Sequence, residues 1–419
     1  MNGKELHKKQ YGEKKLISSN FSGSYLRRLR VVLLQPFLSH YREPIYNLLC
    51  RQEYPNPKYS FLSDIVNNSG IKTIDFQQSR IAVQNGGLHW QKVSNVWFGK
   101  NFLWQLAAIR LALDKDVDCI ILLGNMYYIS NWIGAILARL TGKRILLWTH
   151  GYLREEKGIK GWIREKFYKL SDGLLLYGNR GRQLLRRRGF DPECLYVVYN
   201  SLNYEEQCKV RDNCSAEVLK GIRQSLFSLS DLPVLIFVGR LTPQKKLSML
   251  IEAAHILKKK GIELNILFVG DGPERKNFEQ LVLSYSMTSN VVFYGACYTE
   301  EELGPLFMLS DLCVAPGEIG LTCMHAFAYG IPVVTHDNPD LQGPEWEAIQ
   351  PGITGELFRY DDVQDLARVI AGWLELGKSR KQLSVDCRRI IDRYYNPSYQ
   401  AMVINGAVCG VSVADMLDK

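Results

Sequence analysis

The amino-acid sequence predicts an α/β protein of two domains, each built on a doubly wound parallel sheet. The chain has 419 residues, of which 46% are apolar, so it is long enough for two separate cores. In both halves, short and nearly continuous apolar runs alternate with segments of helical spacing. This alternation is typical of parallel sheets with helices on both faces, and two such sheets are expected to share a ligand-binding cleft.

The N-terminal half contains five predicted strands, the first within residues 29–35. Each is a nearly continuous apolar run, as expected of strands that are buried on both faces. One stretch, residues 119–138, carries no charged residue and is long enough to imitate a transmembrane helix. Gly124 and Asn125 in its interior divide it instead into a strand, a loop and a helix. The five strand sequences are LRVVLLQ, CIILLG, RILLWTH, GLLLYG and CLYVVYN.

The C-terminal half is more regular, and its predicted strands are PVLIFVGR, LNILFVG, NVVFYG, LCVA and PVVT. Between the two halves, residues 201–230 are largely polar and give no strong strand signal. The domain boundary is therefore placed near residues 201–206, which gives a first domain over 29–203 and a second over 204–395. Residues 1–28 form a basic arm that lacks the apolar stretch of a signal peptide and is predicted to be disordered.

The most informative segment covers residues 311–336 and reads DLCVAPGEIGLTCMHAFAYGIPVVTH. It predicts a strand, a turn at PGE, a helix that ends at Tyr329 and a second strand. On that helix Glu318, Thr322 and His325 share one stripe with Tyr329, because their spacings are three to four residues. A helix that follows a glycine-containing turn directs unpaired amides toward its N-terminal end. The segment therefore predicts a diphosphate site.

Loops after two other predicted strands of the second domain carry further candidates. In GRLTPQKK, Arg240 and Lys245 follow Gly239 and would offer two cations to a diphosphate. Taken alone, these cations are more simply interpreted as surface side chains. In GDGPER, Gly270 and Gly272 permit a tight turn but lack the third glycine of a dinucleotide fingerprint, and the chain has no GxxxxGK[ST] motif. Both dinucleotide binding and a P-loop are therefore disfavoured.

The first domain offers two candidate loops at the carboxyl ends of its strands. His150 ends the strand RILLWTH and precedes Gly151, so its imidazole is expected at the cleft, and a functional role is favoured over a structural one. The loop after the first strand carries the acceptor-side candidates. For its histidine, a functional and a structural role are equally open. These candidates are Ser39, His40, Tyr41 and Arg42.

Charge and cysteines narrow the class of protein. The formal charge is +9 and is uneven, with basic blocks in residues 1–30 and 154–188. The second block carries an amphipathic stripe around Trp162 and fits either an anionic membrane surface or an ordinary pair of solvated helices. Nucleic-acid binding is disfavoured because aromatic residues are not interleaved with the charge. The ten cysteines lack paired short spacings, so free thiols in a reducing cytoplasm are expected.

Together, the motifs GRLxxxK, GDGPER, the PGxxGL turn and AYGIPVV resemble, in this order, the retaining nucleotide-sugar glycosyltransferases of family 4. The resemblance extends over nearly the whole chain from about residue 30 and implies the GT-B fold of two facing Rossmann-like domains. The N-terminal pieces HYREPIYNLL and GLLLYGNRGRQLLRRRGF look like the subgroup that builds bacterial surface polysaccharides. Residues 396–419 look like the family's final helix, which crosses back to the first domain.

The resemblance implies a role for each matching residue. The first domain would bind the acceptor and the second the nucleotide-sugar donor. Arg240 and Lys245 would bind the donor diphosphate and stabilise the leaving nucleotide, and His150 would lie near the transferred sugar. The remaining donor-side positions are Gly239, Gly270, Gly272, Glu318, Thr322, His325 and the amides of Ile319, Gly320 and Leu321.

Two positions depart from the family pattern. The family usually has two glutamates with seven residues between them, the first at the sugar and the second at the ribose. In this chain those positions hold Gly317 and His325, and Glu318 stands one residue late. A histidine can still donate to or accept from a ribose hydroxyl. The surrounding pattern is coherent, so we interpret the segment as a variant active site.

The sequence therefore predicts a hexosyl-type transferase that uses a nucleotide-diphosphate sugar, needs no metal and no other cofactor, and retains anomeric configuration as the resemblance implies. The expected acceptor is a saccharide, lipid-linked on the cytoplasmic face of the membrane, where the protein would bind peripherally. No acidic pair of DxD type stands at a convincing strand end. Two alternatives stay open: a nucleotide-sugar epimerase on the same architecture, and a non-catalytic subunit that only binds the sugar nucleotide.

Overall fold

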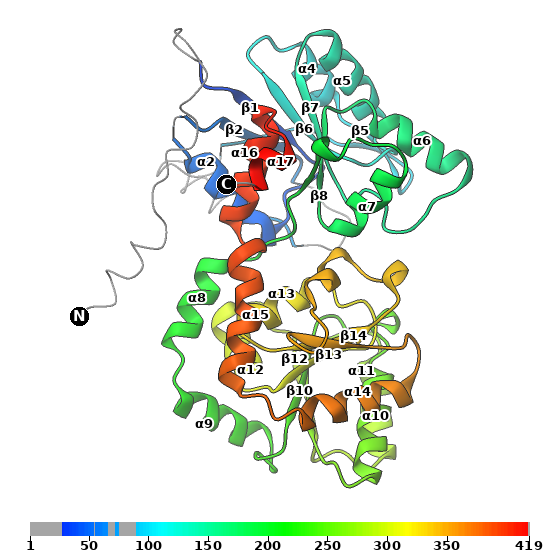
Figure 1. Cartoon of the computed structure of the whole chain (residues 1–419), viewed down its shortest axis with the longest axis vertical. Helices are drawn as coiled ribbons and strands as arrows, with labels where there is room; N and C mark the ends of the chain where they lie inside the picture. The colour runs from blue at the N-terminus through cyan, green and yellow to red at the C-terminus, as the bar shows by residue number, and fades with distance from the viewer. Residues whose placement is uncertain (1–26, 54, 66–71, 75–88, 418–419) are drawn as a thin grey trace, which may run out of the picture.

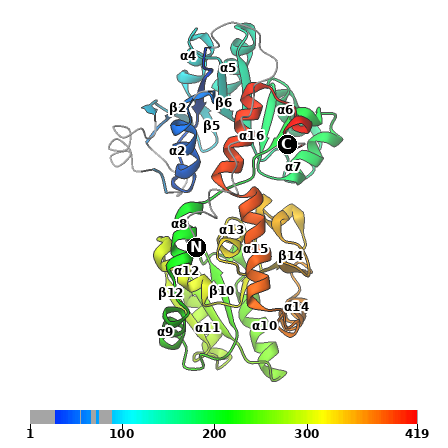
Figure 2. The ribbon, with the colours of Figure 1, turned by 60° about the vertical axis from the view of Figure 1, so that its left-hand side comes forward.

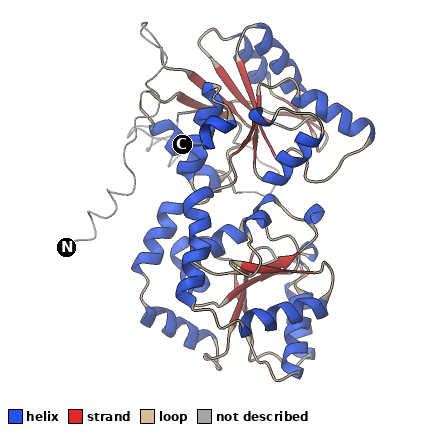
Figure 3. Ribbon diagram, viewed as in Figure 1, coloured by secondary structure: helices blue, strands red, loops and turns tan. Residues whose placement is uncertain are grey.

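A computed structural model describes residues 27–53, 55–65, 72–74 and 89–417. They form two α/β domains joined by a linker and by the C-terminal helices, which run along one side of both domains (Figure 1). The predicted basic arm lies almost wholly outside the described residues. In each domain the strands form a central sheet between layers of helices (Figure 3).

The first domain contains a seven-stranded, all-parallel sheet. All five strands predicted for this half are present. Two further strands at one side of the sheet were not predicted: β2, which alternates buried and polar residues, and β3, which is short and polar. The order is β3 (Trp90–Lys92), β2 (Lys58–Ser63), β1 (Arg30–Leu34), β6 (Cys119–Leu123), β7 (Arg144–Thr149), β8 (Gly173–Leu176) and β9 (Leu195–Val197).

Side chains of these strands alternate between two cores, one on each face of the sheet. Leu33 and Trp148 belong to one core, and their neighbours Leu34 and Leu147 to the other. This alternation explains why the strands read as continuous apolar runs. The helices of this domain are α2 (Glu43–Arg51), α4 (Leu106–Leu113), α5 (Ile129–Leu140), α6 (Gly158–Tyr168) and α7 (Asn179–Arg187), and a hairpin of β4 (Val96–Phe98) and β5 (Phe102–Trp104) packs beside α5.

The second domain has a six-stranded parallel sheet in which all five predicted strands occur. An additional edge strand, β15, was not predicted because its sequence GELF contains a charge and only two large apolar residues. Numbered within the domain, the strand order is 3-2-1-4-5-6, the order of a Rossmann fold. The strands are β12 (Val291–Gly295), β11 (Asn265–Val269), β10 (Val234–Val238), β13 (Leu312–Ala315), β14 (Val333–His336) and β15 (Gly355–Phe358).

Helices cover both faces of this second sheet. They are α10 (Ser248–Lys259), α11 (Arg275–Ser284), α12 (Glu300–Met308), α13 (Thr322–Ala328) and α14 (Val363–Glu375). The polar segment that follows the predicted boundary near residues 201–206 forms α8 (Tyr204–Asn213) and α9 (Ala216–Leu226) before β10 begins.

The chain returns to the first domain through two successive helices, α15 (Arg380–Tyr394) and α16 (Pro397–Cys409), which lie nearly end to end (Figure 2). Asn396 stands between them and caps α16 by accepting a hydrogen bond from the amide of Tyr399. Ala401, Ile404 and Ala407 then join the core of the first domain. The two domains are thus tied at two places along the sequence.

Two further predictions concern the whole chain. The uncharged stretch 119–138 divides into β6 and α5 as predicted, and none of the helices in the described ranges is long and apolar enough to cross a membrane. All ten cysteines are free thiols, as expected from their spacing.

Candidate active site

A cleft of about 850 Å³ lies between the two domains. Its first-domain wall is made by residues that follow β1, β6, β7 and β8, so it lies at the carboxyl edge of the sheet, where strand order reverses between β1 and β6. The second domain contributes Glu318 and residues 340–342, from the loops after β13 and β14. Both carboxyl edges therefore face one cavity, as doubly wound sheets predict for a ligand site.

His150 lies on this cleft, at the end of β7, in a turn that a buried hydroxyl network holds. Thr149 Oγ1 donates to the carbonyl of Gly124 over 3.1 Å and accepts from the amide of Gly151 over 3.2 Å. The Tyr168 hydroxyl lies 2.9 Å from Thr149 Oγ1 and donates to the Gly151 carbonyl over 3.1 Å. The backbone of Gly151 is left-handed, with φ +66°, so a residue with a Cβ would strain the turn that aims the imidazole.

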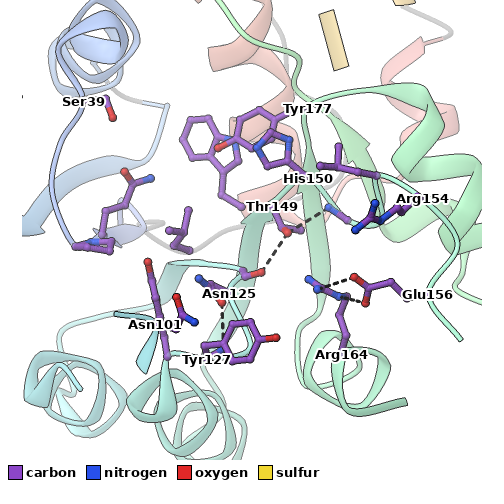
Figure 4. A pocket seen from close by; sticks show the side chains of 18 of the residues that line it. Ser39, Asn101, Asn125, Tyr127, Thr149, His150, Arg154, Glu156, Arg164 and Tyr177 are labelled. Carbon is purple, nitrogen blue, oxygen red and sulfur yellow. Dashed lines mark hydrogen bonds and ion pairs between the residues drawn. The ribbon is translucent and has the colours of Figure 1, made fainter. Parts of the chain in front are cut away.

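The His150 ring is accessible from the cleft although protein surrounds it on its other sides. It lies against Tyr177, with ring centroids 4.4 Å apart, and the two rings are side by side in Figure 4. The surrounding protein desolvates the ring, and this effect together with the smaller one of the Arg42 charge lowers the pKa of His150 to about 4. His150 is therefore a neutral imidazole at physiological pH, able to accept one hydrogen bond and donate another.

The loop after β1 divides its predicted acceptor-side residues between two hollows. Ser39 and Arg42 line the main cleft, His40 lines a second hollow, and Tyr41 lies between them and lines both. Ser39 is only 6% exposed. The structure therefore brings Ser39, Tyr41 and Arg42 to the same cavity as His150, and it separates His40 from them.

In the second domain, the loop that carries Lys245 packs directly on the turn after β13. The ammonium group of Lys245 donates to the carbonyl of Glu318 over 2.6 Å, and the amide of Gly317 donates to the Lys245 carbonyl over 3.0 Å. Burial lowers the pKa of Lys245, while the charges of Glu318 and Glu345 act in the opposite direction. Lys245 thus joins two loops beneath the cleft.

This packing explains the departure at position 317. A Cβ added to Gly317 would lie 2.2 Å from the carbonyl oxygen of Gln244 and 2.8 Å from the Cα of Lys245. With this backbone, no side chain fits where the family pattern has its first glutamate. Glu318, one residue later, is exposed and lines the main cleft instead.

The predicted helical stripe from Glu318 to Tyr329 is wrong at its start. The helix α13 begins only at Thr322, because Gly320 adopts a left-handed conformation with φ +53°. Glu318 therefore precedes the helix and faces a different hollow from His325. Thr322 is on α13, but its hydroxyl donates to the carbonyl of Val238 over 2.9 Å.

Two of the amides predicted to hold phosphate, those of Gly320 and Leu321, lie in this left-handed turn before α13. The amide of Ile319 is already hydrogen-bonded. It donates to Gln342 Oε1 over 3.1 Å, and Ile319 is only 1% exposed, so this amide is not free for a phosphate.

Arg240 is exposed after β10, and within the described ranges its side chain has no hydrogen-bond or ion-pair partner. Two of the three predicted glycines, Gly270 and Gly272, are required by close backbone contacts. A Cβ on Gly270 would lie 1.9 Å from the carbonyl oxygen of Gly239, and one on Gly272 would lie 2.3 Å from that of Leu241. These glycines let the loops after β10 and β11 touch, which fixes the backbone on either side of Arg240.

His325 lies in the second hollow, of about 900 Å³, which is also formed by both domains. Its Nδ1 is 3.5 Å from Glu300 Oε1 and 3.3 Å from Gln207 Nε2, and its ring stacks on Phe307. Glu300 also accepts from the Tyr329 hydroxyl over 2.6 Å. Burial raises the pKa of Glu300, but the hydrogen bonds from His325, Tyr329 and Gln207 outweigh it, and the net pKa is lowered.

Three acidic residues that contact the first domain were missed by the sequence analysis. Glu347 accepts from the amides of Asn179 and Arg180, over 2.6 and 2.8 Å, at the N-terminal end of α7. Glu345 accepts from Asn200 Nδ2 over 2.6 Å, and Asp340 pairs with Arg180. Their signal in the sequence is three acids within eight residues after β14, in DLQGPEWE.

The second domain is similar in sequence to known glycosyltransferases. Residues 220–388 match the family described as glycosyl transferases group 1. The chain is 24% identical over 213 residues to alpha-D-kanosaminyltransferase from Streptomyces kanamyceticus, and the alignment covers 49% of this chain and 53% of that protein. It is 25% identical over 263 residues to the putative glycosyltransferase EpsD from Bacillus subtilis, and that alignment covers 57% of this chain and 64% of EpsD. The matches thus span about half to two thirds of these relatives.

Solved structures extend the likeness to nearly the whole chain. Anabaena Alr3699/HepE, crystallised in complex with UDP, superposes with a TM-score of 0.66 over 91% of this chain and 99% of that one, at 16% identity. A glycosyltransferase from Rickettsia africae superposes with a TM-score of 0.67 over 92% and 99%, at 15% identity. The fold predicted from the sequence is confirmed, and so is the enzyme class at the level of a glycosyltransferase domain. The chain has the GT-B fold, and residues 220–388 of its second domain match the family described as glycosyl transferases group 1.

Proposed function

We propose that this chain transfers a hexosyl-type sugar from a nucleotide-diphosphate sugar to a hydroxyl group of a saccharide acceptor. The observation that carries the proposal is the cleft, which has a neutral histidine on the first-domain wall and a cation-bearing loop beneath the second-domain wall. HepE, with the same fold, was crystallised with UDP, and EpsD and the kanosaminyltransferase are named as glycosyltransferases. These names support a nucleotide-sugar donor.

The donor would bind mainly to the second domain. Arg240, which has no partner within the described ranges, and Lys245 would contact the diphosphate and stabilise the charge that builds on the leaving nucleotide. Glu318 is exposed to the main cleft, where it can accept from sugar hydroxyls. The pair of His325 and Glu300 in the second hollow would contact the ribose, so a carboxylate stands beside the position where the family pattern has one.

The acceptor would enter along the first domain, and closure of the cleft would bring its hydroxyl to the sugar. As a neutral imidazole, His150 can donate to or accept from hydroxyls of the transferred sugar. Retention of anomeric configuration belongs to the proposal through the resemblance to family 4. A saccharide carried by a lipid, in surface-polysaccharide synthesis on the cytoplasmic membrane face, is the proposed acceptor.

Removing the two cations tests the donor site. Arg240→Ala and Lys245→Ala should each lower kcat about a hundredfold, because each removes a contact to developing negative charge. Lys220→Ala, an exposed lysine on α9, is the matched control and should leave the rate unchanged. Rates within a few-fold of the unmodified protein for both variants would show that the diphosphate binds elsewhere.

A single assay separates transfer from the two alternatives. The purified protein is incubated with a panel of nucleotide sugars, with and without a bacterial lipid extract, and both free nucleoside diphosphate and donor conversion are measured. A transferase releases nucleoside diphosphate when acceptor is added. An epimerase converts the donor without acceptor and without nucleotide release, and a binding subunit does neither.

Metal independence is part of the proposal, because the cations of Arg240 and Lys245 can supply positive charge at the diphosphate. The rate of nucleotide release should be unchanged after exhaustive treatment with EDTA. A loss of activity that Mg²⁺ or Mn²⁺ restores would contradict this part of the proposal and leave the transfer itself intact.

The proposed membrane contact rests on one side of the first domain. Ile129, Ile133, Ile136 and Leu140 are exposed along α5 at spacings of three to four residues, and Phe102 of the adjacent hairpin is 46% exposed. The basic helix α6 lies next to α5, because Trp132 of α5 packs on Phe167 of α6 with ring centroids 4.9 Å apart. Two apolar side chains of α6 are exposed, Ile159 at 79% and Trp162 at 59%. Apolar groups beside lysines suit an anionic bilayer surface.

Vesicle flotation tests this contact. Ile159→Ser with Trp162→Ser, and separately the reversal of charge at Arg186, Arg187 and Arg188, should each weaken binding to vesicles that contain anionic lipid. Leu283→Ser, which changes a 67% exposed leucine on the second domain, should not. Tight binding that survives both sets of changes would show that this side of the domain does not contact the bilayer.

A further inference from the structure

The first-domain wall of the cleft holds three buried hydrogen-bond donors that lack an acceptor. They are Gln35 Nε2, Arg42 Nε and Trp148 Nε1, and none has a partner among the described residues. Gln35 is 4% and Trp148 0% exposed, and all three residues line the same cavity. Buried polar groups are nearly always hydrogen-bonded, so three unmatched donors in one wall indicate a site that acceptor atoms would complete once these side chains rotate to expose their donors.

Arg42 is the charged member of this group. Its guanidinium lies 5.1 Å from the ring centroid of Trp148, 4.9 Å from that of Tyr177 and 5.3 Å from that of Tyr41. It donates to the Tyr177 hydroxyl, and within the described ranges no carboxylate pairs with it. Aromatic faces offset the cost of a buried charge only in part, because a cation–π contact is weaker than pairing with a carboxylate. The environment therefore favours an anionic ligand.

The other charges on the wall do not neutralise Arg42. Glu156, the first-domain carboxylate among the lining residues, already accepts from Arg164 over 2.8 Å and lies 3.7 Å from the ammonium group of Lys160. Arg154 lines the cavity without an ion pair in the described part of the chain. His150 is neutral because of its low pKa. The wall is therefore positive. The carboxylate of Glu318, which has no ion-pair partner in the described ranges, belongs to the opposite domain.

We infer that the wall formed by Gln35, Arg42 and Trp148 binds an anionic group of the acceptor, a carboxylate or a phosphate, beside His150. This inference rests on the proposed function in one respect, that the first domain receives the acceptor. The planar guanidinium and the neighbouring amide and indole donors suit the oxygens of a carboxylate or phosphate. A neutral saccharide would leave the Arg42 charge unmatched. The acceptor is thus a uronic-acid-bearing or phosphate-bearing saccharide.

Binding measurements on the full chain test this without a transfer assay. Titration calorimetry with methyl glucuronide, glucose 6-phosphate and methyl glucoside compares a carboxylate, a phosphate and a neutral sugar of similar size. At least one anionic sugar should bind more tightly than methyl glucoside. Arg42→Met should weaken that binding about tenfold or more, because a charged hydrogen bond is lost. Arg42→Lys should keep part of the affinity for the anionic sugar. The control Arg110→Met, on the exposed face of α4, should keep all of that affinity.

Pyrophosphate serves as the donor probe in the same titrations. Its binding should be unchanged in Arg42→Met and lost in Arg240→Ala. Loss of pyrophosphate binding in Arg42→Met would assign Arg42 to the donor and overturn the inference. So would equal binding of the anionic sugars to the unmodified protein and Arg42→Met, provided that circular dichroism shows the variant folded. Unchanged pyrophosphate binding in Arg240→Ala would instead count against the proposed donor site and leave Arg42 unaffected.

Discussion

His150 combines exposure to the cleft with surroundings that keep it uncharged. Replacing it with asparagine keeps one donor and one acceptor but shifts their positions, so kcat should fall about tenfold or more with little change in thermal stability. Steady-state kinetics of nucleotide release, with melting temperature measured in parallel, checks this. His40→Asn, in the second hollow, is the comparison and should reduce kcat less.

The low pKa of His150 also predicts the pH dependence of the reaction. Because the pKa is about 4, the imidazole stays neutral from pH 8 down to about pH 5. The plot of kcat/KM against pH should therefore have the same shape near pH 6.5 in the unmodified protein and in His150→Asn. A limb at that pH in the unmodified protein that is absent in the variant would contradict a neutral imidazole at position 150.

His336 predicts how stability changes with pH. It is 1% exposed, and burial lowers its pKa to about 4, against about 6.5 in an unfolded chain. Between these values the unfolded state binds more protons, so stability is full above about pH 7 and falls as the pH drops toward 4, by roughly 3 kcal/mol at most from this residue. Urea unfolding at several pH values should show this slope, and His336→Gln should reduce it.

At the residue scale, the sequence predicted where the candidate side chains stand but not what they contact. His150, Arg42 and Glu318 could be placed at strand ends because apolar runs end there, and all three line the cleft. The lack of an acidic partner for Arg42 among the described residues, and the clash that forces glycine at 317, depend on residues far away in the chain. Such contacts leave no local pattern in the sequence.

The turn between β13 and α13 connects the loop after β10 with the main cleft. Gly317→Ala should destabilise the protein by about 1–3 kcal/mol, because its Cβ would meet the Gln244 carbonyl at 2.2 Å. It should also lower the transfer rate, since Lys245 shares that loop. Gly221→Ala is the matched control: no atom lies within 4 Å of its Cβ on helix α9, so it should be neutral or stabilising. Chemical denaturation of both variants gives the comparison.

Elements were predicted well where the apolar pattern was continuous and poorly elsewhere. Ten strands were found because buried parallel strands read as unbroken apolar runs. The strands β2, β3 and β15 were missed, because polar residues interrupt them. The helix α13 was predicted too long, since its pattern continues through Gly320 although the backbone does not.

The relative position of the domains depends on acidic residues of the second domain that contact the first. Glu347 accepts hydrogen bonds from two backbone amides at the start of α7. Glu347→Ala should therefore lower the free energy of unfolding by about 1–3 kcal/mol and loosen the contact between the domains. Small-angle X-ray scattering should show a larger radius of gyration than that of the unmodified protein. Glu375→Ala, an exposed acid at the end of α14, is the control and should leave the radius unchanged.

The last helices give the molecule an unusual order of assembly. Ala401, Ile404 and Ala407 of α16 fill the core of a domain whose strands were all made before residue 198. During synthesis the first domain must therefore wait, with an open apolar face, until the whole second domain has left the ribosome. Nascent chains of this protein should consequently bind chaperones at their N-terminal half for most of their synthesis, and release them only when the final helix arrives.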